Sequence, residues 1–557
     1  MSAPLLPMVL RKDHSLVLAV YSEAAASVTE LDGDTRCYTG DYRECEIVFN
    51  PARPTFFAHA TTTTLTYTEV VETDAAAGEE DPRRFSFRTI FAVPMSHTAV
   101  GLAFSPKGTY LVTYAMMDPR RTPDGNLSVF DSATGKLLRR GMQARWPAMI
   151  WTADESYVVR PVQGWLHTMS GDLAASALST DLSGDANGAG GEDTDDASTT
   201  AAAAAAAAAG GPLSKLDLML AQDKEIEFAT APADGRPMLA LFKPFYKQRQ
   251  ATFAVYRLPQ LREGPLYSVN LGRAEAATLL WSPSGAHVAV LVQSERDPSG
   301  KSYYGTAQLL IIDAMNRTSV DVKLKGEGET VHDCQWSPTS DELLVVHGKM
   351  PRNKCTLFNK SGVALVTFGE APRNMAAWAP NGTRFVVGGS GNLAGDFQFY
   401  NRPQMMMAAA GGGAGSAAAV AVASTATCTG EFNEKCSFQT WGPDSYTFLC
   451  STVFTRLRMD NKIVVAKVNG TRVLTQRYPV LYGAHWVAMR APQAYAPRTA
   501  SPRTAGEEKP KAQAYRPPGG TSRASALLRR EPEAPQQAKS AGPVGSTVVT
   551  QKKKRRH

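Results

Sequence analysis

One short element recurs along the chain and constrains its fold more than any other feature. A large aromatic residue is followed by a small residue, usually a proline, a turn-forming residue and then a run of apolar residues. Five clear copies begin at Phe104, Trp281, Trp336, Trp378 and Trp441. Weaker copies begin at Phe49, Trp151 and Phe228. The pattern predicts a strand that ends in an apolar plug, a tight turn and a second strand.

A second marker follows the clear copies by about 23 to 32 residues. At this marker an apolar strand ends in an Asp or Asn before another turn, at Asp131, Asp313, Asn359, Asn401 and Asn469. Two hairpins per repeat make a four-stranded unit, which is typical of a propeller blade. Because no stretch sustains apolar residues at helical spacing, few helices are expected. The predicted fold class is therefore all-β, with a single large β-propeller.

The spacing of the copies predicts the number of blades. The two longest gaps contain two low-complexity segments, residues 170–213 and 404–428, which cannot bury a core and are interpreted as insertions in blade loops. Without them the first 490 residues leave about 420, or roughly 47 for each of nine blades. That length is close to the roughly 40–45 residues typical of WD-type repeats. Nine blades are favoured, and eight is the alternative.

Residues 491–557 differ in composition from the rest of the chain. They hold nine prolines and few aliphatic residues, which predicts a disordered tail after a propeller domain of residues 1–490. The tail has fourteen Lys or Arg residues against four Glu residues, a formal charge of +10. Since the whole chain carries +7, the first 490 residues carry −3. The basic character therefore belongs to the tail.

The cysteines and the apolar segments indicate where the protein works. Seven cysteines, an odd number without any Cys-x-x-Cys pair, favour reduced thiols over a disulfide framework or a structural zinc. The first ten residues show no secretory signal, and the uncharged Ala/Gly run at 404–428 is too weakly apolar for a membrane span. We expect a cytoplasmic protein with no membrane partner.

Motifs for catalysis or cofactor binding were sought, and the nearest is the segment from Asp297 to Ser302. It contains Gly-Lys-Ser, but Glu295 occupies the position where a P-loop requires glycine, and the flanking segments have the pattern of strands. The nine histidines are dispersed and form no metal-ligand pattern. The sequence therefore predicts a protein that is not an enzyme and has no cofactor and no metal.

Several peptides, in the same order and blade contexts, resemble the eukaryotic translation initiation factor 2A family. They are Ser302-Tyr-Tyr-Gly305, Ala371-Pro-Arg-Asn374, Gly391-Asn-Leu-Ala-Gly395, Arg456-Leu-Arg-Met-Asp-Asn461 and Ala514-Tyr-Arg-Pro-Pro518. The resemblance implies a nine-bladed propeller followed by a basic region. It also implies binding of initiator methionyl-tRNA, mRNA and the small ribosomal subunit, independently of the main GTP-dependent tRNA carrier. Members usually continue into a long helical segment after Tyr-Arg-Pro-Pro, whereas this chain has about forty Pro/Ala-rich residues there.

Candidate RNA- and ribosome-binding residues come from these peptides and from the tail. Tyr303 and Tyr304 are candidates for stacking on an unpaired base, with ordinary loop packing as the alternative. Arg373, Asn374, Arg456 and Arg458 are candidates for phosphate contacts, and the alternative is that they tie loops together. In the tail the candidates are Arg516, Lys552, Lys553, Lys554, Arg555 and Arg556, and the terminal cluster is alternatively a nuclear-import signal. The repeated tryptophans are interpreted as plugs between blades.

The predicted function is that of a translation initiation factor that acts as a monomeric binding protein. The implied partners are initiator tRNA, mRNA, the small ribosomal subunit and other initiation factors. Two alternatives are a WD-type scaffold within a larger initiation-factor complex and an adaptor in a nuclear assembly. The first resembles the propeller subunit of the third initiation factor, but the RNA-recognition motif that precedes that propeller has no counterpart here.

Overall fold

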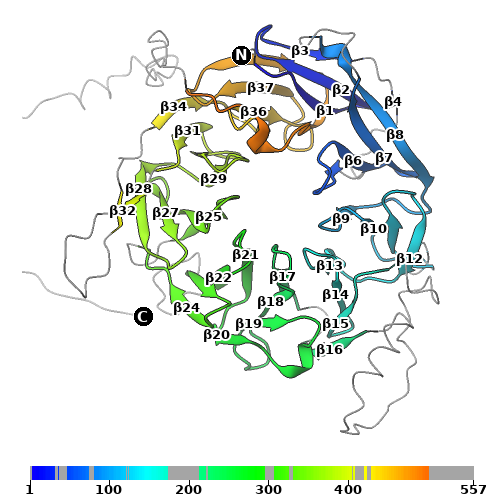
Figure 1. The fold of residues 1–557 in the computed structure, drawn as a ribbon, viewed down its shortest axis with the longest axis vertical. Helices are drawn as coiled ribbons and strands as arrows, with labels where there is room; N and C mark the ends of the chain where they lie inside the picture. Colours follow the sequence, from blue (N-terminus) through cyan, green and yellow to red (C-terminus); the bar gives the residue numbers. More distant parts are fainter. Residues whose placement is uncertain are drawn as a thin grey trace, which may run out of the picture. The chain divides into compact units, whose positions relative to one another are not determined.

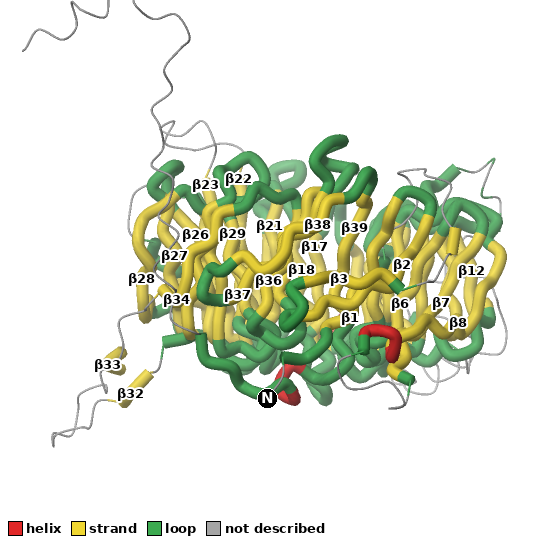
Figure 2. The backbone as a smooth tube through the Cα atoms, turned by 90° about the horizontal axis from the view of Figure 1, so that it is seen from above, coloured by secondary structure: helices red, strands yellow, loops and turns green. Residues whose placement is uncertain are grey.

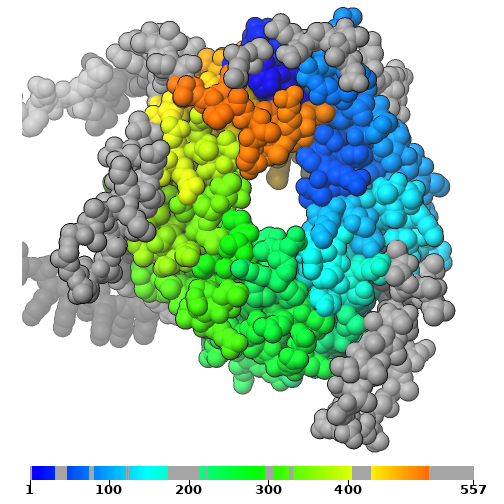
Figure 3. Space-filling view, in the orientation of Figure 1, coloured from blue at the N-terminus to red at the C-terminus, as the bar shows by residue number. Residues whose placement is uncertain are grey.

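The structure is a computed structural model that describes most of the chain up to residue 500. The described residues are 3–31, 35–36, 47–73, 81–118, 120, 122, 124–173, 212–220, 224–294, 306–324, 330–403, 405–407, 420–422 and 428–500. Within them, nine β-sheets follow one another in chain order around a central opening (Figures 1 and 3). Each sheet is one blade, and its strands are given below from the innermost to the outermost.

The first three blades contain the N-terminal strands and the last strand of the chain. Blade 1 consists of β39 (Leu481–Trp486), β1 (Leu6–Lys12), β2 (Ser15–Ser22) and β3 (Ser27–Glu30), with β4 (Thr35–Arg36) also paired to β2. Blade 2 consists of β5 (Val48–Phe49), β6 (Phe56–Ala60), β7 (Thr64–Glu72) and β8 (Phe85–Pro94). Blade 3 consists of β9 (Gly101–Phe104), β10 (Tyr110–Tyr114), β11 (Leu127–Asp131) and β12 (Leu137–Gly141).

The next three blades follow the same antiparallel order. Blade 4 consists of β13 (Ile150–Trp151), β14 (Tyr157–Val162), β15 (Trp165–Ser170) and β16 (Ser214–Asp217). Blade 5 consists of β17 (Glu227–Thr230), β18 (Met238–Lys243), β19 (Thr252–Arg257) and β20 (Tyr267–Asn270). Blade 6 consists of β21 (Ala276–Trp281), β22 (His287–Ser294), β23 (Thr306–Asp313) and β24 (Thr318–Asp321).

The last three blades complete the set. Blade 7 consists of β25 (Val331–Trp336), β26 (Glu342–His347), β27 (Asn353–Asn359) and β28 (Ala364–Ala371). Blade 8 consists of β29 (Met375–Trp378), β30 (Arg384–Gly388), β31 (Asp396–Asn401) and β34 (Cys428–Asn433), and the hairpin of β32 (Met405–Met407) and β33 (Val420–Val422) lies between its last two strands. Blade 9 consists of β35 (Phe438–Trp441), β36 (Thr447–Thr452), β37 (Lys462–Lys467) and β38 (Arg472–Arg477). The only helical segments in the described part are three 3₁₀ turns, η1 (Pro82–Arg84), η2 (Leu261–Glu263) and η3 (Pro492–Ala494).

The core of this fold lies between the blades. Middle strands such as β22 and β26 are apolar on both faces because successive side chains point to opposite faces of a sheet that is covered on both sides. In β26, for example, Leu343 and Val345 pack against blade 6 while Leu344 and Val346 pack against blade 8. The described residues form nine such clusters, one between each pair of neighbouring blades, including blades 9 and 1. The predicted all-β propeller is confirmed, and the favoured number of nine blades is correct.

Both predicted repeat markers have a structural role. Tryptophans at the ends of four innermost strands donate from Nε1 to a backbone carbonyl of the preceding blade: Trp281 to Ala229 at 3.0 Å, Trp336 to Leu280 at 2.9 Å, Trp378 to Gln335 at 3.3 Å and Trp441 to Ala377 at 3.0 Å. The second marker closes the outer hairpin. Asp131 Oδ1, for instance, accepts from the backbone amides of Ala133 and Thr134 at 2.9 and 2.8 Å. The tryptophans thus lie between blades, as predicted.

The ring closes through the two ends of the propeller sequence. The strand β39 is the innermost strand of blade 1 and pairs antiparallel with β1, with Met8 opposite Trp486. Leu481 and Ala484 of β39 share a core cluster with Leu449 and Ile463 of blade 9. Trp486 therefore gives the ninth innermost strand a large aromatic residue, as in the other eight. The repeat pattern does not predict it because no turn to a following strand comes after it.

The chain stays in contact with the propeller beyond the boundary predicted at residue 490. Tyr495 packs against the cluster between blades 9 and 1, and Ala500 packs against the cluster between blades 8 and 9. Arg498 lies with its Cζ 3.8 Å from the ring centroid of Tyr446 and its Nη2 2.7 Å from Oε2 of Glu23. The division into propeller and tail remains a prediction, and residues 501–557 lie outside the described residues.

Candidate functional site

The order of strands divides the loops of the propeller between two faces. Turns between the first and second strands of a blade, and between the third and fourth, lie on one face, which we call the lower face. Loops between the second and third strands, together with the connections from one blade to the next, lie on the opposite, upper face. The N-terminus, the 3₁₀ turns and the hairpin of β32 and β33 follow the lower edge in Figure 2. Both predicted insertions fall between third and fourth strands, and the strand ends that flank them lie on the lower face.

Arg456 and Arg458 lie on the upper face, in the loop that joins β36 to β37. Both are exposed, and between and beside them Leu457 and Met459 are also exposed, Met459 to 73%. The base of the loop is well held: the amides of Arg456 and Leu457 donate to Val453 O at 3.1 and 3.0 Å, and Asn461 Nδ2 donates to Leu457 O at 2.7 Å. The loop thus holds its backbone rigidly while four side chains point to solvent.

Arg373 and Asn374 occupy the connection from blade 7 to blade 8, also on the upper face. Arg373 is only 3% exposed, and its Nη1 donates to Phe368 O at 3.0 Å and to Gly369 O at 2.8 Å, while Nη2 donates to Gln398 Oε1. Asn374 donates to Ser390 O at 3.1 Å and accepts from Ser390 N at 2.9 Å. This geometry supports the alternative that these two residues tie loops together.

The other predicted site residues lie outside the described residues. Tyr303 and Tyr304 belong to the segment between β22 and β23 that the structure leaves undescribed, and so does Lys301. The tail candidates Arg516, Lys552, Lys553, Lys554, Arg555 and Arg556 are all beyond residue 500. Their assignment as RNA contacts stays a proposal.

Exposed apolar side chains gather on the upper face. Its loops, and the strand ends beside them, carry Val100, Met116, Met117, Trp146, Trp165, Met219, Met350, Phe438, Leu457 and Met459. Among the described residues of the lower face, the exposed large apolar residues in turns are Met315 and Val363. Solvent-exposed Met and aromatic side chains are costly for a free surface and are common where a partner binds. The upper face therefore has the composition of a binding surface.

One hollow on the upper face is a groove of about 590 Å³ over blades 3 to 6. Trp146 forms part of its wall, stacks on Tyr114 at 5.5 Å between ring centroids and remains 37% exposed. This packing requires glycine at position 101, because a Cβ there would lie 2.8 Å from the Trp146 ring. Arg145 and Lys224 also line the groove, and Arg145 Nη1 donates to Lys224 O at 2.6 Å. The volume is in the roughly 300–1,000 Å³ range of typical ligand pockets.

The residues beside this groove were not predicted from the sequence, although a signal was present. The stretch from Phe242 to Gln250 interleaves the aromatic residues Phe245 and Tyr246 with the cations Lys243, Lys247 and Arg249. Such interleaving is typical of single-stranded nucleic-acid binding. The stretch lies between the weak copy of the blade marker at Phe228 and the clear copy at Trp281, and it belongs to none of the peptides that carry the family resemblance.

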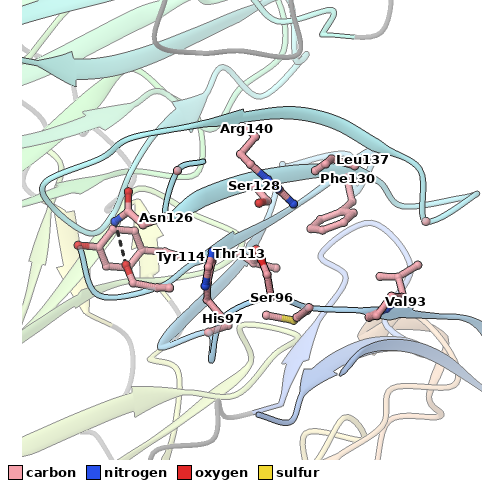
Figure 4. Close-up of a pocket in the computed structure, with 16 residues that line it drawn as sticks. Val93, Ser96, His97, Thr113, Tyr114, Asn126, Ser128, Phe130, Leu137 and Arg140 are labelled. Carbon is pink, nitrogen blue, oxygen red and sulfur yellow. Dashed lines mark hydrogen bonds between the residues drawn. The ribbon is translucent and has the colours of Figure 1, made fainter. Parts of the chain in front are cut away.

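A second cavity, shown in Figure 4, lies between the outer strand of blade 2 and blade 3. Its volume of about 220 Å³ is below the usual size of a ligand pocket, and its lining includes His97, Thr113 and Arg140. Asn126 at its edge donates to Ala115 O and Gln143 O, both at 2.8 Å, and accepts from Gln143 N at 2.7 Å. These polar groups hold the upper loop of blade 3 in place.

Metal, disulfide and membrane features were sought in the described part of the chain. No group of three or more His, Cys, Asp or Glu residues there is arranged to hold a metal ion. Its five cysteines, Cys334, Cys355, Cys428, Cys436 and Cys450, are free, and burial raises the pKa of Cys334 and of Cys355 to about 12. None of its helical segments has the length and hydropathy needed to span a bilayer.

Comparison with known proteins gives consistent matches. Residues 270–410 match the family model of "Eukaryotic translation initiation factor eIF2A". The protein named eukaryotic translation initiation factor 2A from Schizosaccharomyces pombe is 26% identical over 496 residues, which cover 86% of this chain and 73% of the relative. The proteins of that name from Dictyostelium discoideum and Drosophila melanogaster are 27% and 28% identical and match 69% of this chain. The chain spans about half the length of these two relatives, 54% and 53%.

Two further matches bear on the fold and on the alternative function. A solved structure titled "Crystal structure of the eukaryotic initiation factor" superposes with a TM-score of 0.61 at 21% sequence identity. The superposition covers 86% of this chain and 98% of the chain in that structure. It supports the nine-bladed fold. A component of eukaryotic translation initiation factor 3 from Arabidopsis thaliana is 24% identical over 324 residues, 55% of this chain and 41% of the relative. The family matches confirm the resemblance that the sequence peptides predicted.

Proposed function

We propose that this chain, which resembles eukaryotic translation initiation factor 2A along most of its length, acts in translation initiation as a non-enzymatic binding protein in the cytoplasm. Its partners are initiator methionyl-tRNA, mRNA and the small ribosomal subunit, and it acts independently of the main GTP-dependent tRNA carrier. The observation that carries the proposal is the extent of the similarity, which reaches 86% of the chain with the fission-yeast relative.

The upper face supports this proposal as the surface that selects the partner. Arg456 and Arg458 project from a loop whose backbone is held by three hydrogen bonds, so both side chains start from a held segment of backbone. Fixed cations favour one arrangement of phosphates, whereas cations in a flexible tail neutralise phosphates of any RNA. We therefore assign selectivity to the propeller and general affinity to the terminal residues Lys552, Lys553, Lys554, Arg555 and Arg556.

A salt titration tests this division. Binding of initiator tRNA and of an unrelated RNA is measured for the full chain, for a variant without the five terminal cations, and for the Arg456→Ser/Arg458→Ser double variant. The tail variant should bind both RNAs more weakly, with a log–log salt slope that falls by at most about 3.5. The double variant should lose the preference for initiator tRNA. If the full chain shows no preference and does not sediment with small subunits, the proposed function is wrong.

Nucleotide chemistry is tested separately. Because the Gly-Lys-Ser motif near Lys301 lacks the first glycine of a P-loop, the purified protein should show neither saturable GTP binding nor GTP hydrolysis. The Lys301→Ala variant should bind RNA and small subunits as the unchanged protein does. Saturable GTP binding that this substitution abolishes would contradict the non-enzymatic assignment.

One observation favours a second candidate function, that of a scaffold within a larger initiation-factor complex. The exposed methionines and aromatic residues of the upper face suit a protein partner, and part of the chain is similar to a component of the third initiation factor. The two functions differ in their need for RNA. Association with other initiation factors that survives nuclease treatment supports the scaffold, whereas association lost with the RNA supports the binding protein.

A further inference from the structure

The loop between β18 and β19 of blade 5 has a backbone that its sequence does not favour. Tyr246 and Arg249 pair as an isolated bridge, with Tyr246 N to Arg249 O at 3.2 Å and Arg249 N to Tyr246 O at 2.9 Å. The two residues between them, Lys247 and Gln248, have φ values of 45° and 68°. A two-residue hairpin turn with both residues at positive φ is a type I′ turn, which strongly prefers Asn-Gly or Gly-Gly.

Lysine and glutamine at these positions therefore cost conformational energy that Asn or Gly would avoid. Backbone strain of this kind clusters at functional sites, which raises the hypothesis that the side chains of Lys247 and Gln248 have a function. Both Lys247 and Gln248 are exposed, so packing of their side chains into the protein does not account for the choice. Nearby, Met219 is also in the left-handed region with φ 54°, and its Sδ accepts from Arg249 Nη1 at 2.9 Å.

The strained turn brings cations and aromatic rings together. Lys247 Nζ lies 5.1 Å and Lys224 Nζ lies 6.0 Å from the ring centroid of Tyr246. Arg273 Cζ lies 5.7 Å from the ring of Phe245 at the base of the same loop. Burial is the main cause that lowers the pKa of Lys243; the charge of Arg249 lowers it further, and the nearby carboxylate of Asp217 acts in the opposite direction. Lys224 connects the turn to the groove, whose wall it shares with Trp146.

The groove beyond the cations differs in charge. Glu225, Glu227 and Glu275 line it together with Trp146 and apolar residues. Carboxylates repel phosphate but accept hydrogen bonds from the amino groups of bases, such as N4 of cytosine. The turn thus presents cations at the outside, and the groove presents an exposed indole ring and acceptors at the inside. A phosphate on the turn and a base in the groove would each meet complementary groups.

We propose that this surface, formed by Tyr246, Lys247, Arg249, Lys224 and Trp146, binds an unpaired RNA strand. The cations of the turn contact the phosphates, and Trp146 and Tyr246 stack on bases that are splayed away from their neighbours. A duplex does not fit this arrangement because its bases are stacked on one another and unavailable to the rings. The inference rests on the proposed function and deepens it, since it names the kind of RNA and the blades that receive it.

Substitution within the turn separates this role from a structural one. Lys247→Asn removes the charge and places at positive φ a residue that tolerates it, so the melting temperature should stay the same or rise. Binding of a labelled single strand of about 10 nucleotides should weaken, with a log–log salt slope lower by about 0.7. Tyr246→Ala should weaken binding at least about fivefold, and Tyr246→Phe should restore it.

A matched control exists on the lower face. Arg317 is exposed, lies in a turn and has φ 58°, so Arg317→Asn removes one charge from the same backbone region far from the groove. It should bind the single strand as the unchanged protein does. The same strand annealed to its complement should bind less tightly than the single strand and respond little to Tyr246→Ala.

The outcomes distinguish this inference from the proposed function. If the full chain prefers initiator tRNA but Lys247→Asn binds the single strand normally, or loses no more affinity than Arg317→Asn, only the assignment of this surface is wrong. If the full chain binds neither RNA, the proposed function fails with it. A Lys247→Asn variant that keeps RNA affinity but loses association with a nuclease-treated protein partner would assign the surface to protein binding and overturn the inference.

Discussion

The two faces of the propeller use their loops for different purposes. On the lower face, turns of several neighbouring blades bond to each other. Examples are Lys107 N to Glu155 Oε1 at 2.7 Å, Ser284 Oγ to Asp341 Oδ2 at 2.6 Å, and Asn381 N to Ser445 Oγ at 3.1 Å. On the upper face, the loop of Arg456 bonds within itself, and the loop of Lys247 also bonds through Arg249 to Met219 in the neighbouring connection. Both loops leave long side chains in solvent. The lower face stabilises the ring, and the upper face is available for partners.

At the seam where the ring closes, the lower face again carries the bonds between blades. On the lower face, Arg498 lies over Tyr446 and reaches Glu23 of blade 1, Lys467 of blade 9 also reaches Glu23 at 2.7 Å, and Arg384 of blade 8 donates to the Arg498 carbonyl. These contacts link three consecutive blades through one short segment after the last strand. They predict that changes near the seam affect stability, and that changes on the upper face affect binding.

Removal of the closing strand should have the largest effect. A chain that ends at residue 480 lacks β39, so β1 loses a neighbouring strand and the cluster between blades 9 and 1 loses Leu481 and Ala484. An open edge and an uncovered core favour unfolding or aggregation. We expect no cooperative thermal transition and a high apparent mass by size exclusion. A chain that ends at residue 500 is the control and should melt as the full chain does; identical melting of both truncations would show that β39 does not close the ring.

The second largest effect is expected from Arg498→Ala. It removes a charge-assisted hydrogen bond to Glu23, whose side chain is mostly buried, and should lower the free energy of unfolding by about 1–3 kcal/mol. Binding of initiator tRNA at a temperature where both proteins are folded should not change. A measured loss of RNA binding without a loss of stability would place Arg498 in the binding surface instead.

The Arg498 contribution should depend on pH. Burial of Glu23 acts to raise its pKa, but hydrogen bonds from Lys467 and Arg498 outweigh it, and the pKa is lowered overall. The pKa of a glutamate in the unfolded chain is about 4.3. Because the pKa of Glu23 is lower in the folded protein, its ion pairs stabilise the fold fully above that pH, and this stabilisation is lost as the pH falls through the pKa of the folded state. The difference in melting temperature between the unchanged protein and Arg498→Ala should therefore shrink below about pH 4. A constant difference down to acidic pH would mean that packing on Tyr446 dominates.

A smaller effect is expected at a single bond between blades. Trp336→Phe keeps most of the ring but removes the donor to Leu280 O, which should cost about 0.5–1.5 kcal/mol. Trp165, which is 43% exposed at an upper strand end, provides the comparison. Trp165→Phe should leave the free energy of unfolding nearly unchanged in chemical denaturation. Equal losses in the two variants would show that the indole bond contributes nothing specific.

The smallest effect on stability is expected for Arg456→Ser/Arg458→Ser. Both side chains are exposed, so the free energy of unfolding should change by less than about 0.5 kcal/mol, although the preference for initiator tRNA should be lost. Denaturant melts and RNA titrations on the same preparations measure both. Substantial destabilisation would indicate that the upper loops also hold the ring, which would weaken the distinction between the two faces.

Most of the blades could be located from the sequence because a propeller blade has a local signature. Phe49, Phe104, Trp151, Phe228, Trp281, Trp336, Trp378 and Trp441 all lie in innermost strands, where a large ring fills the space between blades. Trp486 escaped detection because the strand next to it in space comes from the other end of the chain. A pairing between residues almost 480 positions apart leaves no local pattern in the sequence.

The candidate site was predicted less well, since burial is a property of the assembled blades. Arg373 and Arg456 look alike in the sequence, because each lies in a polar loop and in one of the peptides that carry the family resemblance. Once the blades assemble, Arg373 donates to the carbonyl groups of Phe368 and Gly369 and is buried, whereas Arg456 remains exposed. Likewise, composition placed the tail boundary at residue 490, but Tyr495 and Arg498 find partners on blades 8, 9 and 1 that are distant in the sequence.

The sequence by itself determined that the chain is an all-β propeller of about nine blades with loop insertions and a basic end, because strand periodicity, turn residues and charge are local properties. Only the tertiary structure decided that both insertions connect strand ends on one face, while most of the exposed large apolar side chains among the described residues lie on the other. It also decided that β39 closes the ring and that Lys247 and Tyr246 meet Lys224 beside a groove. These features depend on which strands are neighbours in space, and that is settled only when all nine blades pack together.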